Sequence, residues 1–399
     1  MSNHFERFLA QKKEAIEAVM ETFQRGSEVV ASAVGEFFPL CEVATPVLKL
    51  VLDNVESKEV VYVKEQFIVV NNRLDVISSQ LDDINCEIQK GHVDSQYFSV
   101  EENIRNQFRK YQDILEAKPQ FQEVKIRLFL DHFSKTGGEK NLNVLYDALM
   151  GTNTFGESIL EAVERYEFKN RRVLEDFCVR MKELFCLGLI VLLSHYALTK
   201  REDMEQLKLS EWKEKIQEVE TKMKEVIEEC VNSFPTQAHE DVQKLVQEKD
   251  GDSLQDTAQA LISFLEKKYD WVSWSVRIIS HSGNSSGSLW PNRRTRDNFQ
   301  CVEGQNCFHL LQRNGNNIVV SYCLNPQPIP KDTIQQLMDG PAKKGDAEAV
   351  VENLKIPLSG FMVHAVSSHK QSFAAYNISE DCHYWEKHKN VALCVHSDQ

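Results

Sequence analysis

Residues 60–88 read VVYVKEQFIVVNNRLDVISSQLDDINCEI, and apolar residues recur in this stretch at alternating intervals of three and four. The seam consists of Val60, Val63, Phe67, Val70, Leu74, Ile77, Leu81, Ile84 and Ile88. Such spacing is typical of a long helix that packs along one narrow face. At ~1.5 Å per residue, a helix over 57–90 would be on the order of 50 Å long. Gly91 stands where a glycine commonly ends a helix.

The same spacing returns in residues 209–230. The second seam consists of Leu209, Trp212, Ile216, Val219, Met223, Val226 and Cys230. Ser210 suits a helix start, and Pro235 lies just past the expected end. Two long helices with narrow seams predict an elongated multi-helix bundle with coiled-coil-like helices. The seams can pack inside one chain, which we favour, or pair between chains.

The pattern changes near residue 270. Further helices are expected before that point, over 3–24, 28–53, 94–116, 120–134, 140–150, 156–199, 239–248 and 253–268. From Trp271 onward, apolar and polar residues alternate as in strands. Strand-like runs lie within 272–278, 317–324, 361–366, 372–376 and 391–395, with helices near 331–339 and 345–354. We therefore predict a mainly α protein, with a helical bundle domain over 1–269 and a small α+β domain over 270–399.

Charge is distributed unevenly along the chain. The net charge is −14, and hydrophobic residues make up 42% of the sequence, as in a globular protein. Residues 1–270 hold 34 Lys and Arg against 49 Asp and Glu, whereas residues 271–399 hold 12 against 11. An acidic surface argues against nucleic-acid binding, which needs cations at the phosphates. It also disfavours simple adsorption to anionic lipid.

The first residues, MSNHFER, lack a basic region followed by an apolar one. No classical secretory signal is visible, so a cytoplasmic location is the default expectation, with unconventional secretion as the alternative. The ten cysteines are then expected to be reduced.

Residues 185–198, FCLGLIVLLSHYAL, contain no Lys, Arg, Asp or Glu. The stretch is shorter than the ~20 residues that a membrane-spanning helix needs. One interpretation is a central helix buried on all sides of the bundle. A second is a segment that leaves the bundle and inserts into a membrane, for which the candidate residues are Phe185, Leu187, Leu189, Ile190, Val191, Leu192 and Leu193. A third is a constitutive transmembrane helix.

Two groups in the C-terminal part could bind ligands. Arg293, Arg294 and Arg296 lie beside Trp290 in a polar stretch and form a candidate anion or lipid-headgroup patch, with a solvated loop as the alternative. The cysteines and histidines there do not show the pair spacings of structural zinc sites in a compatible local structure, so no metal is expected.

The sequence offers no catalytic signature in a supporting context. It contains no phosphate-binding G-x-x-x-x-G-K-[ST], no G-x-G-x-x-G and no H-E-x-x-H, and the G-x-S-x-G spacing of residues 283–287 falls in a flexible Ser/Gly-rich polar loop. We therefore expect no enzymatic activity, no cofactor and no small-molecule substrate.

Residues 47–67, VLKLVLDNVESKEVVYVKEQF, and 70–81, VNNRLDVISSQL, resemble the rapunzel family of bony fish and the related cephalotoxin-like proteins. The resemblance implies a protein without catalytic residues, associated with fin and skeletal growth, whereas the cephalotoxin-like relatives are secreted toxins. Our leading hypothesis is a non-enzymatic protein that acts through self-association or protein partners. The alternative is a membrane-active protein, similar to α-helical pore-forming toxins, that releases apolar helices into lipid.

Overall fold

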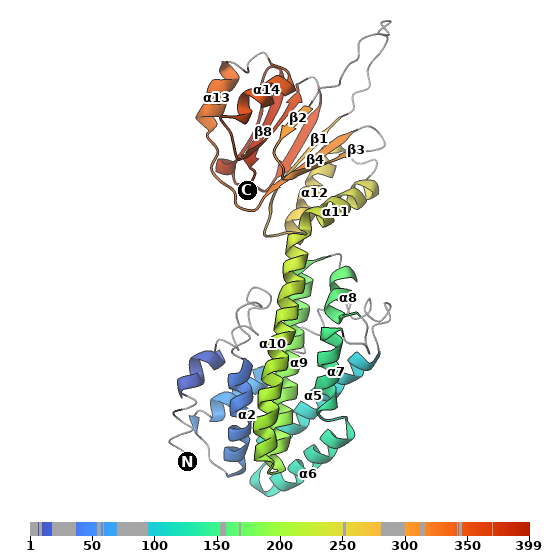
Figure 1. The fold of residues 1–399 in the computed structure, drawn as a ribbon, viewed down its shortest axis with the longest axis vertical. Coiled ribbons are helices and arrows are strands. Elements are labelled where there is room, and N and C mark those ends of the chain that lie inside the picture. The colour runs from blue at the N-terminus through green and yellow to red at the C-terminus, as the bar shows by residue number, and fades with distance from the viewer. Residues whose placement is uncertain are drawn as a thin grey trace. The chain divides into compact units, whose positions relative to one another are not determined.

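The computed structural model describes most of the chain (Figure 1). The described residues are 7, 10–17, 37–53, 57, 58, 60–69, 95–151, 157–166, 169–249, 253–280, 300–311, 316–340, 342, 345–368 and 370–399. The chain divides into two compact units, Met1–Ser233 and Phe234–Gln399. As predicted, the fold is mainly α, with a small C-terminal α+β part.

The first unit is a bundle of helices. Its described helices are α2 (Phe37–Leu52), α5 (Ser95–Glu116), α6 (Pro119–Lys135), α7 (Lys140–Met150), α8 (Ile159–Tyr166), α9 (Arg171–Leu198) and α10 (Glu202–Asn232). Helix α9 contacts each of the other six. The central position of α9 explains why its stretch 185–193 is apolar on every side, since a helix surrounded by helices has no face that meets water.

Both seams lie in the core of this unit where the structure describes them. On α10, Trp212, Ile216, Val219, Met223, Val226 and Cys230 are buried in the same core as α9. This packing within one chain agrees with the interpretation that we favoured. Val60, Val63 and Phe67 are also buried, whereas the rest of the first seam, from Val70 to Ile88, lies outside the described residues.

Some predicted helix boundaries were wrong. Helix α10 begins at Glu202, ahead of the predicted start at Ser210. The single helix expected over 156–199 is two helices, α8 and α9. Lys169 adopts a positive φ of 57°, and the side chain of Asn170 caps the new helix by accepting from the backbone N–H of Val173. Periodicity misses such a break, because both helices keep their apolar residues in register with one core.

The second unit contains two four-stranded antiparallel sheets. We call them sheet A, in the order β3 (Cys307–Leu311), β4 (Asn317–Cys323), β1 (Ser273–Ile279), β6 (Ser372–Tyr376), and sheet B, in the order β2 (Gln300–Glu303), β5 (Phe361–Ser367), β8 (Val391–Ser397), β7 (His383–Lys387). Its helices are α11 (Phe234–Glu248), α12 (Leu254–Lys268), α13 (Lys331–Asp339), α14 (Ala347–Lys355) and the short 3-10 helix η3 (Glu380–Cys382).

The helices cover the outer faces of the two sheets. Helices α11 and α12 share an apolar core with Trp274, Val276 and Ile278 of sheet A. Helices α13 and α14 share another with Leu393 and Val395 of sheet B. The strands begin near residue 270, as predicted. The compact unit itself begins earlier, at Phe234, because α11 and α12 pack onto sheet A and belong with it. The boundary expected between 269 and 270 therefore marks the change of secondary structure, not the division between units.

Candidate functional sites

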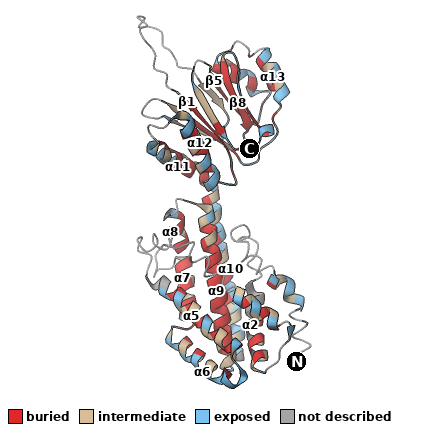
Figure 2. Cartoon of the chain, turned by 180° about the vertical axis from the view of Figure 1, so that it is seen from behind, coloured by how far each residue is buried: buried red, intermediate tan, exposed pale blue. Residues whose placement is uncertain are grey.

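The candidate insertion segment lies at the centre of α9. Its residues Phe185, Leu187, Leu189, Ile190, Val191, Leu192 and Leu193 are all at most 2% exposed, and Figure 2 shows α9 buried along most of its length. Among the described residues, no helix combines the length and the apolar character that crossing a bilayer requires. In this conformation the segment is core, and lipid could reach it only after the neighbouring helices had moved.

Charged residues occupy the first half of α9. Glu175, Arg180, Lys182 and Glu183 are all buried. The Nζ atom of Lys182 lies 3.7 Å from a carboxylate oxygen of Glu220 on α10. Burial lowers the pKa of Lys182, and the nearby Glu220 partly offsets that effect. These partners tie α9 to its neighbours, because removing either one would leave the other charge buried.

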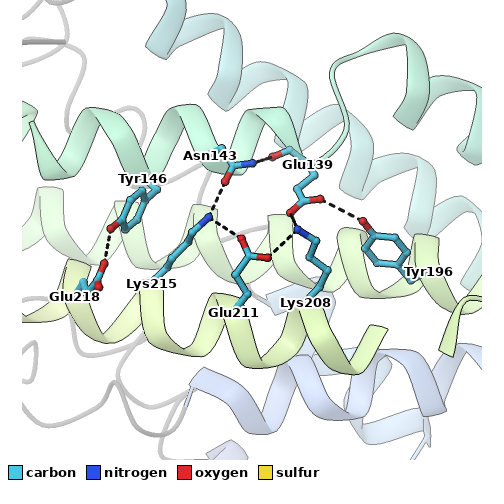
Figure 3. Close-up of polar contacts among 8 residues, drawn as sticks. All are labelled: Glu139, Asn143, Tyr146, Tyr196, Lys208, Glu211, Lys215 and Glu218. Atoms are coloured by element: carbon cyan, nitrogen blue, oxygen red, sulfur yellow. Dashed lines mark hydrogen bonds and ion pairs between the residues drawn. The ribbon is translucent and has the colours of Figure 1, made fainter. Parts of the chain in front are cut away.

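A polar network joins α7 to α10 (Figure 3). Lys208 on α10 contacts Glu139, which precedes α7, at 2.7 Å, and Glu211 at 2.8 Å. Lys215 donates to Glu211 at 2.9 Å and to Asn143 of α7 at 2.9 Å. Burial alone would lower the pKa of Lys208, but hydrogen bonds to the two glutamates outweigh it and raise that pKa.

Tyrosines extend this network at both ends. The hydroxyl of Tyr196 on α9 donates to Glu139 at 3.2 Å. Tyr146 donates to Glu218 of α10, and burial together with that carboxylate raises the pKa of Tyr146 to about 12. Three helices are thus joined by side chains that periodicity does not single out. Their signal in the sequence is only a run of alternating Lys and Glu on α10.

Helix α6 presents an apolar stripe to solvent. Phe121, Val124 and Leu128 are 52%, 46% and 51% exposed, and their spacing of three and four places them on one face of the helix. The opposite face packs inward through Gln122, Phe129 and Phe133. We call the three exposed residues the α6 stripe. Sequence reasoning missed it, because the helix is apolar on two faces and periodicity cannot tell which one meets the core.

The basic patch of Trp290, Arg293, Arg294 and Arg296 lies outside the described residues. It therefore remains an expectation from the sequence. Within the part of the chain that the structure describes, no three His, Cys, Asp or Glu side chains are grouped so as to hold a metal ion.

A buried polar layer separates the two sheets of the second unit. Arg277 on β1 is 0% exposed. One guanidinium nitrogen donates to the Sγ of Cys394 at 2.8 Å and the other to the hydroxyl of Ser321 at 2.8 Å. His383 and His396 of sheet B contact Ser275 and Ser321 of sheet A, at 3.1 and 2.7 Å. We call these residues, with His364, the inter-sheet layer.

The inter-sheet layer was also missed. Ser275 and Arg277 alternate with apolar residues on β1, which normally indicates a solvent-facing side. The second sheet instead covers that side. The layer brings hydroxyl, imidazole and thiol groups together, but each of its members is at most 4% exposed, so a substrate has no access to them in this conformation.

Comparison with known proteins agrees with the fold. Residues 54–251 match the family model described as the cephalotoxin-like middle helical domain, so the class of protein to which this stretch is similar is a helical-bundle one. The chain is also 36% identical over 202 residues to Protein rapunzel of the zebrafish Danio rerio, covering 50% of this chain and 88% of that protein. The chain therefore belongs to the rapunzel family. No solved structure matches it.

Proposed function

We propose that this chain is a non-enzymatic interaction protein of the rapunzel type, which binds a protein partner through its helical unit. The observation that carries the proposal is the α6 stripe, since exposed apolar side chains in a row are characteristic of interaction surfaces. The family resemblance supplies the biological context, fin and skeletal growth, as part of the proposal.

The charges beside the α6 stripe favour an acidic partner. Arg127 and Lys118 are exposed on the same helix or just before it. The other lysines of the helix, Lys125 and Lys135, pair with Asp113 and Asp131 at 3.0 and 2.8 Å. A partner helix with an apolar face flanked by carboxylates would complement Lys118 and Arg127, so we take an acidic partner, rather than a second copy of the chain, as the occupant.

Two designed peptides test this pairing. Both are amphipathic helices with the same apolar face, and one has flanking glutamates where the other has lysines. The glutamate peptide is expected to bind at least tenfold more tightly, as measured by fluorescence anisotropy. Phe121→Ser with Leu128→Ser should abolish binding, whereas Leu207→Ser, which removes an equally exposed leucine from α10, should not. Arg127→Glu should reverse the preference.

Equal binding of the two peptides, or none, would contradict the partner chemistry. A stable dimer in light scattering that dissociates in the Phe121→Ser, Leu128→Ser variant would replace the acidic partner with a second copy of the chain.

The second candidate is membrane activity, with helices around 28–53 and 175–199 released into lipid. The charge-free stretch 185–198 favours it, because burial in a core and burial in hydrocarbon both suit such a helix. Leu192→Arg should abolish lipid activity, since a charge at the centre of a membrane helix costs roughly 2.5–3.5 kcal/mol. That variant would also disturb the soluble core, so a milder test is needed.

A disulfide tether provides the milder test. Gly188 of α9 packs directly against Leu142 of α7, so Gly188→Cys with Leu142→Cys would hold α9 in place. The measurement is leakage from dye-loaded liposomes between pH 5 and 7.5. Leakage that stops with the tether closed and returns on reduction would support release of α9. Equal leakage in both states, or none from the wild-type chain, would exclude that mechanism.

A further inference from the structure

The inter-sheet layer lies where antiparallel sandwiches usually place apolar side chains. Trp274, Val276 and Ile278 of β1 point to the helices, so the alternate residues Ser275 and Arg277 point to sheet B. On β8, Val395 and Leu393 point to helices α13 and α14. Cys394 and His396 therefore point to sheet A. A small apolar cluster of Ile279, Val319 and Val366 also lies between the sheets.

The hydrogen bonds of His396 require a neutral imidazole. The Nδ1 of His396 lies 2.6 Å from the backbone carbonyl oxygen of Ser397, so Nδ1 carries the ring proton and donates there. Its Nε2 then accepts from the hydroxyl of Ser321, which in turn accepts from Arg277. A proton on Nε2 would turn this acceptor into a donor and leave the hydroxyl hydrogen of Ser321 without its acceptor.

His383 makes similar contacts across the layer. Its Nε2 lies 3.1 Å from the hydroxyl of Ser275 and 3.5 Å from the Sγ of Cys394. Its ring stacks on Tyr376 of β6, with the centroids 3.9 Å apart. Because Tyr376 is 42% exposed, this stack forms the edge of the layer nearest to solvent.

Positive groups dominate the surroundings. Arg277 acts on His364, His383 and His396, Lys331 of α13 acts on His383, and His309 of β3 acts on His364. Gln300 of β2 gives His364 a neutral partner at 3.3 Å.

Acidic groups do not offset these charges. Among the described residues, no carboxylate lies within hydrogen-bonding distance of Arg277 or of the three histidines. The carboxylate of Asp398 instead accepts from the backbone N–H groups of Gln305 and Asn306. The thiols of Cys307 and Cys394 complete the titratable groups that face the layer.

We propose that the inter-sheet layer is an acid-sensitive device: in mildly acidic solution His383, His396 and His364 take up protons when sheet A separates from sheet B, and this uptake favours the open form. The driving force is electrostatic, because up to three new positive charges would join the buried guanidinium of Arg277 with no anion to balance them.

The direction of the pH dependence follows from the histidines. Burial, then the neighbouring His396, Arg277 and Lys331, lower the pKa of His383 to about 3. Burial and Arg277 lower the pKa of His396 to about 3 as well. Burial lowers the pKa of His364 well below its ordinary 6.5.

Because the folded pKa values are depressed, the closed form keeps its full stability above pH ~6.5 and loses it as pH falls below that value. Each histidine that protonates only on opening raises the ratio of open to closed forms about tenfold per pH unit.

Hydrogen-exchange mass spectrometry on the full chain tests the proposal between pH 7.5 and 4.5. After correction for intrinsic exchange rates, the ratio of open to closed forms reported by the amides of β1, β4 and β8 should increase roughly 100-fold or more for each pH unit below 6. Amides of α9, in the other unit, serve as the internal control and should not follow this slope. Unchanged protection of the strands at pH 4.5 would overturn the proposal.

Variants identify the groups that respond. The ratio of open to closed forms rises as pH falls, and each histidine contributes about tenfold per pH unit to that rise. His383→Asn with His396→Gln should therefore remove a factor of about 100 per pH unit from it. His239→Asn on α11, outside the layer, is the matched control and should keep the wild-type slope. A double variant that folds and retains the full slope would also overturn the proposal. If the double variant does not fold, the single variants, each expected to lower the slope about tenfold per unit, decide the question.

Discussion

The guanidinium of Arg180 on α9 donates from Nη2 to both carboxylate oxygens of Glu101 on α5, at 2.6 and 2.7 Å. Both side chains are buried within the helical core. Arg105, one turn further along α5, contacts the same carboxylate at 3.0 Å. The carboxylate of Glu101 is therefore the shared counter-charge of two arginines. Its loss should cost more stability than the loss of either arginine.

Glu101→Ala is expected to destabilise the helical unit by about 3–5 kcal/mol, because two cations lose a buried counter-charge. Arg180→Ala should cost less, since Arg105 remains beside the carboxylate. Urea unfolding followed by far-ultraviolet circular dichroism measures both. The double change Glu101→Leu with Arg180→Met should recover much of the loss, and a double variant as unstable as Glu101→Ala would contradict this account.

Gly188 permits the close approach of α9 and α7. A Cβ added there would lie 2.4 Å from the Cδ2 of Leu142, which is only 2% exposed and has little room to move. In Gly188→Ala, the higher helix propensity of alanine should add about 1 kcal/mol to the free energy of unfolding, and overpacking should subtract about 1–3 kcal/mol from it. We expect net destabilisation in thermal melts. Adding Leu142→Val to Gly188→Ala should relieve the clash and recover part of the lost stability. A double variant that loses as much stability as the two single variants together would argue against the clash.

The network between α7 and α10 should respond to pH. Hydrogen bonds from Lys208 and Lys215 hold the pKa of Glu211 below its ordinary value. A depressed folded pKa adds stability above pH ~4.5, which is lost as pH falls below that value. Glu211→Gln should therefore cost at most about 1 kcal/mol at pH 7, because the pair is partly exposed, and nothing near pH 3. Glu228→Gln, on the exposed side of α10, is the control. A penalty for Glu211→Gln that persists at pH 3 would point to lost packing.

Cys323 and Cys382 lie together in a small buried cluster with Ile378. They are close enough that charge on Cys382 adds to the effect of burial in raising the pKa of Cys323. Cys323 ends β4 of sheet A, and Cys382 directly precedes β7 of sheet B. Glutathione disulfide should join them at equilibrium: the two thiols pass two protons and two electrons to the oxidant, which becomes two glutathione thiols. Peptide mapping without reductant would identify the bond, and the melting temperature of the oxidised chain should exceed that of the reduced chain by several degrees. An equilibrium map in which Cys323 and Cys382 are not joined would contradict the prediction.

Much of the helical unit could be predicted from the sequence. The spacing of Trp212, Ile216 and Val219 depends on helix geometry alone, and so does the apolar run from Phe185 to Leu193. Helix positions follow from such patterns because a residue's side of a helix is set by its place in the chain. The break at Lys169 did not follow, because a single residue in a left-handed conformation leaves the pattern on either side intact.

What the sequence could not determine is which polar faces meet water. Ser275 and Arg277 on β1, and Lys208 and Glu211 on α10, look alike as polar positions opposite apolar ones. The first pair is buried beneath a second sheet, whereas the second pair forms a partly exposed network with α7. That difference depends on elements distant in the chain coming together. The sequence by itself determined the approximate positions of most helices and strands and the family, because these depend on local periodicity and residue identity. Only the tertiary structure decided which side chains share an environment, because burial, hydrogen-bond partners and the resulting pKa values are set by neighbours far away in sequence.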